Sequence, residues 1–167
     1  DTDENPYTFA IQGTGTNSTA SDIQTNASYT YTSDIPYVNF QAAALTNANS
    51  VGVFDFVVRD GAGTVDSDTQ STTLTGLTVG YTGTANTIRS ASLFNGATKI
   101  ADGVVSANSI AFSTLSIEAP DNGNSPNITL RVSFTTTVTD NEKLVFNVNS
   151  ATAESAGSLF TSANAGG

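Results

Sequence analysis

The feature that most constrains the fold of this chain is an alternation of apolar and polar residues with a period of two. The alternating runs are short and rich in Val, Ile, Phe and Thr, and clusters of Gly, Asn, Asp, Ser and Pro separate them. A turn signal occurs roughly every eight to twelve residues, which is the spacing typical of β-sandwiches and barrels. The sequence therefore predicts an all-β fold.

The clearest predicted strand covers residues 130–138, LRVSFTTTV, in which Leu130 and every second residue after it share one face. A similar alternation follows at residues 143–151, KLVFNVNSA, with Phe146 on the apolar face. The polar stretch TDNE, residues 139–142, lies between the two strands. Because a short turn can join antiparallel strands, we expect these two strands to form a β-hairpin.

Residues 51–59, VGVFDFVVR, carry apolar side chains on both faces, so we expect a central strand there. A helical pattern occurs at Gln41–Leu45, where one or two helical turns are expected. Further strands are predicted at residues 7–13, 73–81, 88–96, 98–106 and 109–119.

The beginning of the chain differs from the rest in composition. Residues 16–28 are polar and almost free of large apolar side chains, which is typical of a linker or a long loop. They separate a lone predicted strand within residues 1–15 from a predicted β domain at residues 29–167. Because a single strand is not stable in water, we expect it to pair with the main body or with a neighbouring unit. The residues of its apolar face are Tyr7, Phe9 and Ile11.

The residue inventory argues against an enzyme. The chain contains no Cys, His, Met or Trp, so a conventional zinc site, a thiol nucleophile and an imidazole base are excluded. Ser and Thr are abundant, but a hydroxyl nucleophile needs a neighbouring base held in place, and no spacing in the sequence provides one. No pair of acids with the separation of a hydrolase site can be nominated either.

The charge balance restricts the partners. The chain has 5 basic and 15 acidic residues, a net charge of −10 and a sequence pI near 4.1. Such a chain repels phosphate backbones and anionic lipids, so we expect it to bind no nucleic acid. No apolar run approaches the roughly 20 residues of a membrane span, so we expect no membrane insertion. An acidic, soluble chain that collects divalent cations is compatible with an extracellular setting.

The stretch RDGAGTVDSDTQST, residues 59–72, places acidic side chains and glycines between two apolar runs. Asp60, Asp66 and Asp68 are candidate calcium ligands, because the glycines allow the loop to curl back toward Asp60. Calcium takes about six to eight oxygen ligands, more than this loop alone supplies. The alternative is an ordinary turn in which the Asp side chains accept backbone N–H bonds.

A second polar connection, EAPDNGNSPN, covers residues 118–127. Glu118 and Asp121 are further candidate calcium ligands, although Asp-Asn-Gly is equally the composition of an ordinary connection. The sequence cannot tell which loops are neighbours at one end of a sandwich. Calcium is the one cofactor worth testing, and no other is expected.

Several stretches of the sequence resemble segments of known protein families. NPYTFAIQGTG, Asn5–Gly15, resembles the closing strand of Ig-like domains that occur in tandem in large bacterial surface proteins. The rest of the chain runs through IPYVNFQAAALTN, FVVRDGAGTVDSDTQSTTLTGLTV, IRSASLFNG, FSTLSIEAPDNG, LRVSFTTTVTDNEKLVFNVNSATA and AGSLFTSANAGG. In this order these stretches resemble a repeat of the giant secreted adhesins of Bacteroidetes, including those of the gliding-motility type.

The resemblance implies an Ig-like antiparallel β-sandwich of the Greek-key type, export to the bacterial cell surface, and a role as a spacer or adhesive repeat. Its partners would be neighbouring repeats of the same chain or identical subunits, together with a surface glycan or protein target. One alternative is a calcium-dependent carbohydrate-binding β-sandwich. Another is a fibre subunit in which Tyr7–Gly13 completes the sheet of the next subunit.

Overall fold

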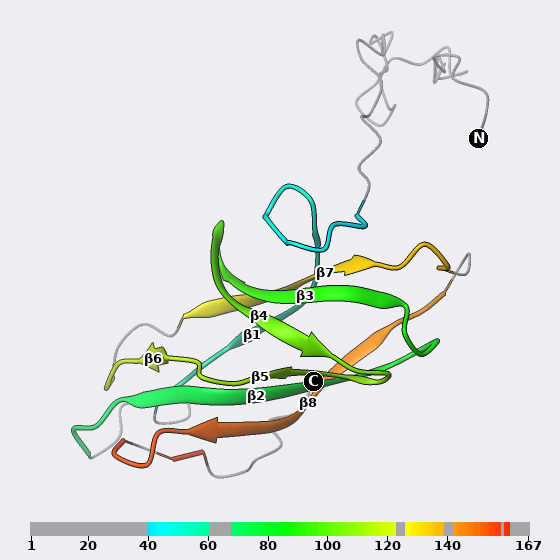
Figure 1. Ribbon diagram of the computed structural model, residues 1–167. Coiled ribbons are helices and arrows are strands. Elements are labelled where there is room, and N and C mark those ends of the chain that lie inside the picture. The colour runs from blue at the N-terminus through cyan, green and yellow to red at the C-terminus, as the bar shows by residue number, and fades with distance from the viewer. Residues whose placement is uncertain (1–39, 61–67, 123–125, 139–141, 158, 161–167) are drawn as a thin grey trace, which may run out of the picture. The chain divides into compact units, whose positions relative to one another are not determined.

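The computed structural model describes residues 40–60, 68–122, 126–138, 142–157 and 159–160 (Figure 1). All of them belong to one compact unit. They form strands, turns and irregular segments, and these ranges contain no helix. The predicted all-β class is therefore confirmed. The predicted strand at residues 7–13, the linker and the start of the β domain lie outside the described residues.

Eight strands pair in an antiparallel manner to form one curled sheet (Figure 1). Their order is β1-β7-β3-β4-β5-β2-β6, and β8 pairs with the other edge of β2. The strands β5 and β6 follow one another along the same edge of β2. Their bounds are Val51–Val57 (β1), Thr72–Thr82 (β2), Ile88–Asn95 (β3), Thr98–Val105 (β4), Ser109–Phe112 (β5), Ile117–Ala119 (β6), Asn127–Phe134 (β7) and Val145–Ala153 (β8).

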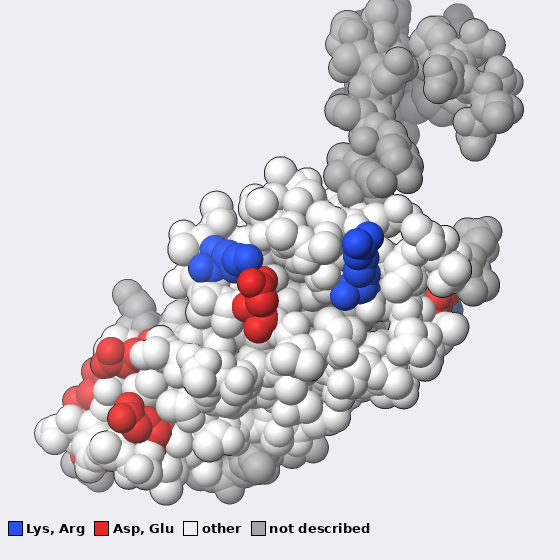
Figure 2. All heavy atoms as spheres, in the orientation of Figure 1, with Lys and Arg blue, Asp and Glu red and all other residues white. Residues whose placement is uncertain are grey.

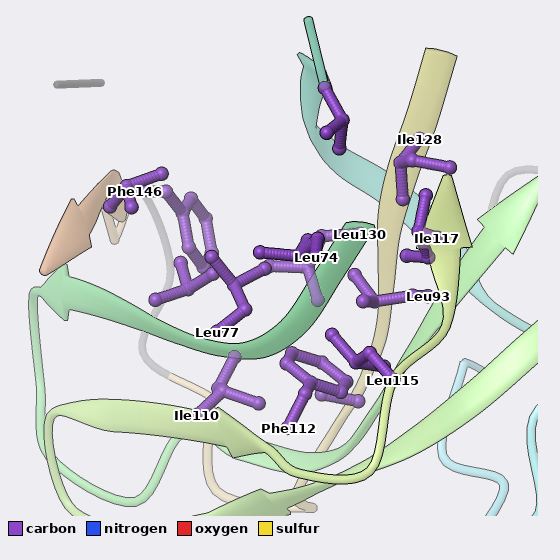
Figure 3. Close-up of a cluster of buried hydrophobic side chains, with 14 of the residues drawn as sticks. Leu74, Leu77, Leu93, Ile110, Phe112, Leu115, Ile117, Ile128, Leu130 and Phe146 are labelled. Atoms are coloured by element: carbon purple, nitrogen blue, oxygen red, sulfur yellow. The ribbon is translucent and has the colours of Figure 1, made fainter. Parts of the chain in front are cut away.

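The alternation in the sequence produces the core. In β7, Ile128, Leu130 and Val132 are fully buried, and in β8 Phe146 and Val148 point into the same interior. Figure 3 shows side chains from β2, β3, β5, β6, β7 and β8 meeting there. Full burial of such a side chain contributes roughly 1.5–3 kcal/mol, so this shared interior is the main source of stability.

The predicted hairpin of residues 130–138 and 143–151 is wrong. Both strands exist, but β7 pairs with β1 and β3, whereas β8 pairs with β2. The ladder of β7 ends at Phe134, and Thr135 then donates its backbone N–H to the carbonyl of Thr87. Since both edges of β7 are already occupied, the chain crosses to the other part of the sheet before β8 begins.

The predicted helical turns at Gln41–Leu45 are absent, because the carbonyl groups of this segment bond elsewhere. The Gln41 carbonyl accepts a hydrogen bond from Arg89 at 2.7 Å, and the Ala43 carbonyl accepts one from Ser90 at 3.0 Å. The Ala42 carbonyl accepts one from the Ser133 hydroxyl. The segment is therefore irregular and lies along β3 and β7.

The prediction of a central strand at residues 51–59 is also wrong, because β1 lies at an outer edge and pairs only with β7 among the described strands. Its apolar residues Phe54 and Phe56 are half-buried, since the sheet curls until β1 approaches β8. The rings of Phe54 and Phe146 stack across this approach with centroids 6.4 Å apart. A strand with apolar side chains on both faces therefore has one backbone edge that pairs with none of the described strands.

The strands β1 and β8 run in the same direction. Both begin at the end of the sheet where Glu142 accepts a hydrogen bond from the backbone N–H of Thr84, at 2.7 Å. Both finish at the opposite end, where β2 begins and β6 pairs with it. We call this second end the acidic end, because acidic side chains gather there (Figure 2). Its described acidic residues are Asp60, Asp68, Glu118, Asp121 and Glu154.

Across the described ranges, no helix has the length and apolar character that crossing a membrane requires.

Candidate cation-binding site and edge groove

Three carboxylates converge at the acidic end. One carboxylate oxygen from each of Asp60, Asp68 and Asp121 lies within 4.8 Å of the other two. Asp60 and Asp68 belong to the β1–β2 connection, and Asp121 belongs to the β6–β7 connection. The pairing of the strands explains why these connections meet, because β1 finishes beside the start of β7 and β2 begins beside β6.

Asp60 is the buried member of this group, with a residue exposure of 6%. Two residues before it, Val58 donates its backbone N–H to the carbonyl of Pro126 at 3.4 Å, which ties the chain after β1 to the β6–β7 connection. The hydroxyl of Thr72, the first residue of β2, donates to Asp60 Oδ1 at 2.7 Å. The position of Asp60 is therefore fixed on the β1 side by the backbone bond of Val58 and on the β2 side by the hydroxyl of Thr72.

The other two carboxylates are oriented by their own loops. Asp68 is exposed, and its Oδ1 accepts the backbone N–H of Gln70 at 2.9 Å, as in an Asx-turn. Asp121 is half-buried, and its Oδ1 accepts a hydrogen bond from the side-chain amide of Asn122 at 2.7 Å. Asn122 has a positive φ of 50°, a conformation that Asn tolerates in turns. These two hydrogen bonds are typical of turns.

The second oxygen of the buried carboxylate stands out. Asp60 Oδ2 is buried and has no hydrogen-bond partner in the described structure. All five basic residues of the chain lie within the described ranges, and none forms an ion pair with Asp60 or Asp121. Because a buried carboxylate without a compensating partner is costly, this oxygen is the least satisfied polar atom of the site.

The structure groups the predicted ligands differently from the sequence analysis. Asp60 and Asp68 were expected in one site and Asp121 in another, whereas all three lie together. Asp66 lies outside the described residues. Glu118 is an exposed residue of β6 that lines a different hollow, with Thr98 and Pro126, and is not part of the group.

A second feature, not predicted from the sequence, is a groove of about 490 Å³ between β1 and β8. It exposes the consecutive residues 54–59 on one side and parts of β2 and β8 on the other. Phe160, which follows β8, lies in it and is half-buried. Mostly apolar residues line the groove, among them Phe54, Phe56, Val57, Val58, Leu74, Leu77, Val148, Ala151 and Phe160.

The gap between β1 and β8 continues beyond the stacked rings of Phe54 and Phe146. At the end opposite the acidic end there is a further hollow of about 310 Å³, lined by Val53, Phe134, Leu144 and Phe146 among others. The only sequence signal for this gap was the apolar character of both faces of residues 51–59. In the structure this pattern belongs to an outer strand that pairs on one edge only among the described strands.

The fold and the site define the class of protein: an all-β module with a curled antiparallel sheet, a group of three carboxylates at one end and an apolar groove between its two outer strands. No family model, curated protein or solved structure matches the chain.

Proposed function

We propose that the chain is a non-catalytic structural or adhesive repeat of an extracellular bacterial surface protein or filament, folded as an Ig-like β-sandwich. The pairing of strands supports two layers, β1-β7-β3-β4 and β8-β2 with β5 and β6, whose apolar faces share one core. The layers are joined through the short β4–β5 ladder, in which Val105 pairs with Ile110.

The single observation that carries the proposal is the shared direction of β1 and β8. The chain enters the ladder at the Val51 end of β1 and leaves β8 at Ala153, at the opposite end of the sheet. Force applied along the chain therefore acts parallel to the outer strands. Because ladder hydrogen bonds are perpendicular to the strands, such a force shears several of them at once instead of breaking them one by one.

The chemistry of the chain supports the extracellular part of the proposal. A net charge of −10 keeps a chain hydrated and soluble, and the resemblance to secreted adhesin repeats implies export. The partners would be neighbouring repeats or identical subunits, with a glycan or protein as the adhesion target. The described chain is tied together by packing and hydrogen bonds, since it has no cysteine to form a disulfide.

The mechanical proposal is tested by single-molecule stretching of the full chain between marker domains. We expect one cooperative unfolding event that releases about 35 nm, the extended length of roughly 100 residues. The control pulls the same chain through cysteines introduced at Arg89 and Val104, at the open end of the β3–β4 ladder, where bonds break sequentially. A lower unfolding force in the control is expected, and equal forces in both geometries would contradict a mechanical role.

The extracellular location has its own test. Antibodies raised against the purified chain should label intact cells of the source organism, and external protease should remove the label. Labelling that requires permeabilised cells would contradict the proposal.

The groove between β1 and β8 favours a second candidate function, a fibre subunit assembled by strand donation. A donated strand would hydrogen-bond to the edge of β1 that no described strand occupies, and would place alternate side chains into the groove. The segment Tyr7–Gly13 matches β1 in length, and its apolar face consists of Tyr7, Phe9 and Ile11. The donor would come from an identical subunit.

The second candidate is tested by the mass of the assembled protein in solution. Under strand donation, the full chain forms oligomers, and deletion of residues 1–15 leaves monomers. Phe9→Asp should act like the deletion, whereas Thr8→Asp, on the opposite face of the predicted strand, should not. A monomeric full chain, or oligomers that survive Phe9→Asp, would exclude this route of assembly.

A further inference from the structure

We infer that Asp60, Asp68 and Asp121 together bind one calcium ion at the acidic end. The ion would link the β1–β2 connection to the β6–β7 connection, two segments that are distant in the sequence. The site rests on the geometry of these residues and is independent of the proposed function. Only the expected affinity depends on an extracellular setting.

The first argument is the unpaired oxygen of Asp60. One oxygen of its carboxylate accepts the Thr72 hydroxyl, and the other is buried without a hydrogen-bond partner in the described structure. Two further carboxylates lie within 4.8 Å of this one, so the group repels itself when all three are ionised. A bound cation removes both problems, because it supplies a partner to the orphan oxygen and compensates the clustered charge.

The second argument is that none of the five basic side chains forms an ion pair with Asp60 or Asp121. Lys99 forms an ion pair with Asp102 at 3.0 Å. Arg131 donates to the Ser50 hydroxyl at 3.0 Å and lies over the ring of Phe94. No basic side chain of the described structure pairs with Asp60 or Asp121, so a cation from solution would supply the compensating charge.

The third argument concerns the choice of metal. The group offers only oxygen ligands, which suit hard cations such as calcium and magnesium. Calcium accepts flexible, irregular coordination by carboxylates, carbonyls and water at about 2.3–2.6 Å, whereas magnesium demands a near-ideal octahedron and keeps its water. Three carboxylates from two separate connections form an irregular set of ligands, which favours calcium.

The location of the site suggests its effect. Just after β8, Glu154 donates its backbone N–H to the Thr73 carbonyl at 2.9 Å, and Gly157 lies against the Ser71 carbonyl. The chain leaving β8 therefore runs along the segment that joins Asp68 to β2. Calcium that fixes this segment would stiffen the acidic end, where the chain leaves the sheet.

The test uses the full chain after removal of metal with a chelator, titrated calorimetrically with calcium. We expect saturable binding of one ion with a dissociation constant of about 10⁻⁴–10⁻³ M, the range of extracellular modules. Magnesium should bind at least about tenfold more weakly, as expected for an irregular site. Absence of saturable calcium binding up to about 10 mM, ten times the upper end of that range, would overturn the inference.

Matched variants locate the ion. Asp60→Asn and Asp121→Asn should each weaken calcium binding at least tenfold, whereas Glu118→Gln, an equal change of charge three residues before Asp121, should leave it unchanged. Equal weakening by all three variants would indicate only non-specific attraction and would contradict the site. Because Asp121 is half-buried, its variant remains informative if substitution of the buried Asp60 prevents folding.

Thermal unfolding gives an independent readout. At a free calcium concentration of one hundred times the dissociation constant, the ratio of folded to unfolded protein should rise about 100-fold. In chelator, Asp60→Asn should melt above the wild type, because it removes one of three mutually repelling charges. In excess calcium the order should reverse. Melting curves of the wild type that are identical with calcium and with chelator would overturn the inference.

Discussion

The hydroxyl of Thr72 donates a hydrogen bond to Asp60 Oδ1 at 2.7 Å, and both residues are buried. This bond joins the first residue of β2 to the segment that follows β1. It holds the buried carboxylate in place while its second oxygen is unpaired. The geometry makes Thr72 the residue that positions the acidic group.

Replacement of Thr72 by Val keeps the branched shape but removes the donor to Asp60. We expect a loss of about 1–3 kcal/mol in the free energy of unfolding in chelator, because both oxygens of a buried carboxylate then lack partners. The measurement is urea-induced unfolding. The control is Thr73→Val in the same strand, which removes a half-buried hydroxyl and should change stability by less than about 0.5 kcal/mol. An equal loss in both variants would show that the bond to Asp60 is unimportant.

A glycine in β4 reports on the packing of the two layers. A Cβ at Gly103 would lie 2.7 Å from side-chain atoms of Ile110 and Phe112, whereas one at Gly76 would meet nothing closer than 3.6 Å. Gly103→Ala should therefore destabilise the fold by about 1–3 kcal/mol through overpacking. Gly76→Ala should be neutral or slightly stabilising, because alanine restricts the unfolded chain. Equal unfolding midpoints for the two variants would contradict the close contact of β4 with β5.

The acid–base behaviour of Asp102 provides a third prediction. A hydrogen bond from the Ser92 hydroxyl at 2.6 Å, and next the ammonium group of Lys99, hold the pKa of the Asp102 carboxyl below its ordinary value. NMR titration should show this pKa below about 3.9 in the wild type. Ser92→Ala should raise it further toward the ordinary value than Lys99→Met. The reverse order would assign the effect to the ion pair.

The lowered pKa of Asp102 also makes the stability of the fold depend on pH. Since folding lowers the pKa of Asp102, its contribution is fully present above the unfolded value near 3.9 and is lost as the pH falls through the folded value. The side chain is 67% exposed, so the contribution at pH 7 should amount to only a few tenths of a kcal/mol. Asp102→Asn should therefore be slightly less stable than the wild type at pH 7, and the difference should shrink in strong acid.

Much of the fold could be predicted from the sequence, because alternation decides which side chains are buried. It correctly placed Leu130, Val132 and Phe146 in the core. Alternation does not decide which strands pair, so the predicted hairpin is wrong. Both edges of β7 are occupied by β1 and β3, and β8 pairs with β2. The predicted helical turns failed for a related reason, since side chains of distant strands take the carbonyl groups of residues 41–43.

The candidate site was predictable only in part. The carboxylates of Asp60 and Asp68 stand out in the sequence because glycines and turn residues surround them. Asp121 joins them only because β6 pairs with the start of β2, which no spacing in the sequence reveals. Glu118 and Asp121 are close in sequence, yet the two residues take different positions at the end of β6, and only Asp121 reaches the group.

Phe160 provides the last prediction, because it lies in the groove between β1 and β8 and packs against the core. Its neighbour Leu159 is 66% exposed, so the two residues form a matched pair. Phe160→Ser should lower the free energy of unfolding by about 0.7–1.5 kcal/mol, since a half-buried aromatic side chain contributes roughly half the value of full burial. Leu159→Ser should change it by less than about 0.5 kcal/mol. Phe160→Ser should also open the groove where Phe160 lies. If the strand-donation route operates, a peptide with the sequence of residues 5–15 should then bind the variant more tightly than the wild type. Equal stability of the two variants would show that the chain after β8 does not hold the groove closed.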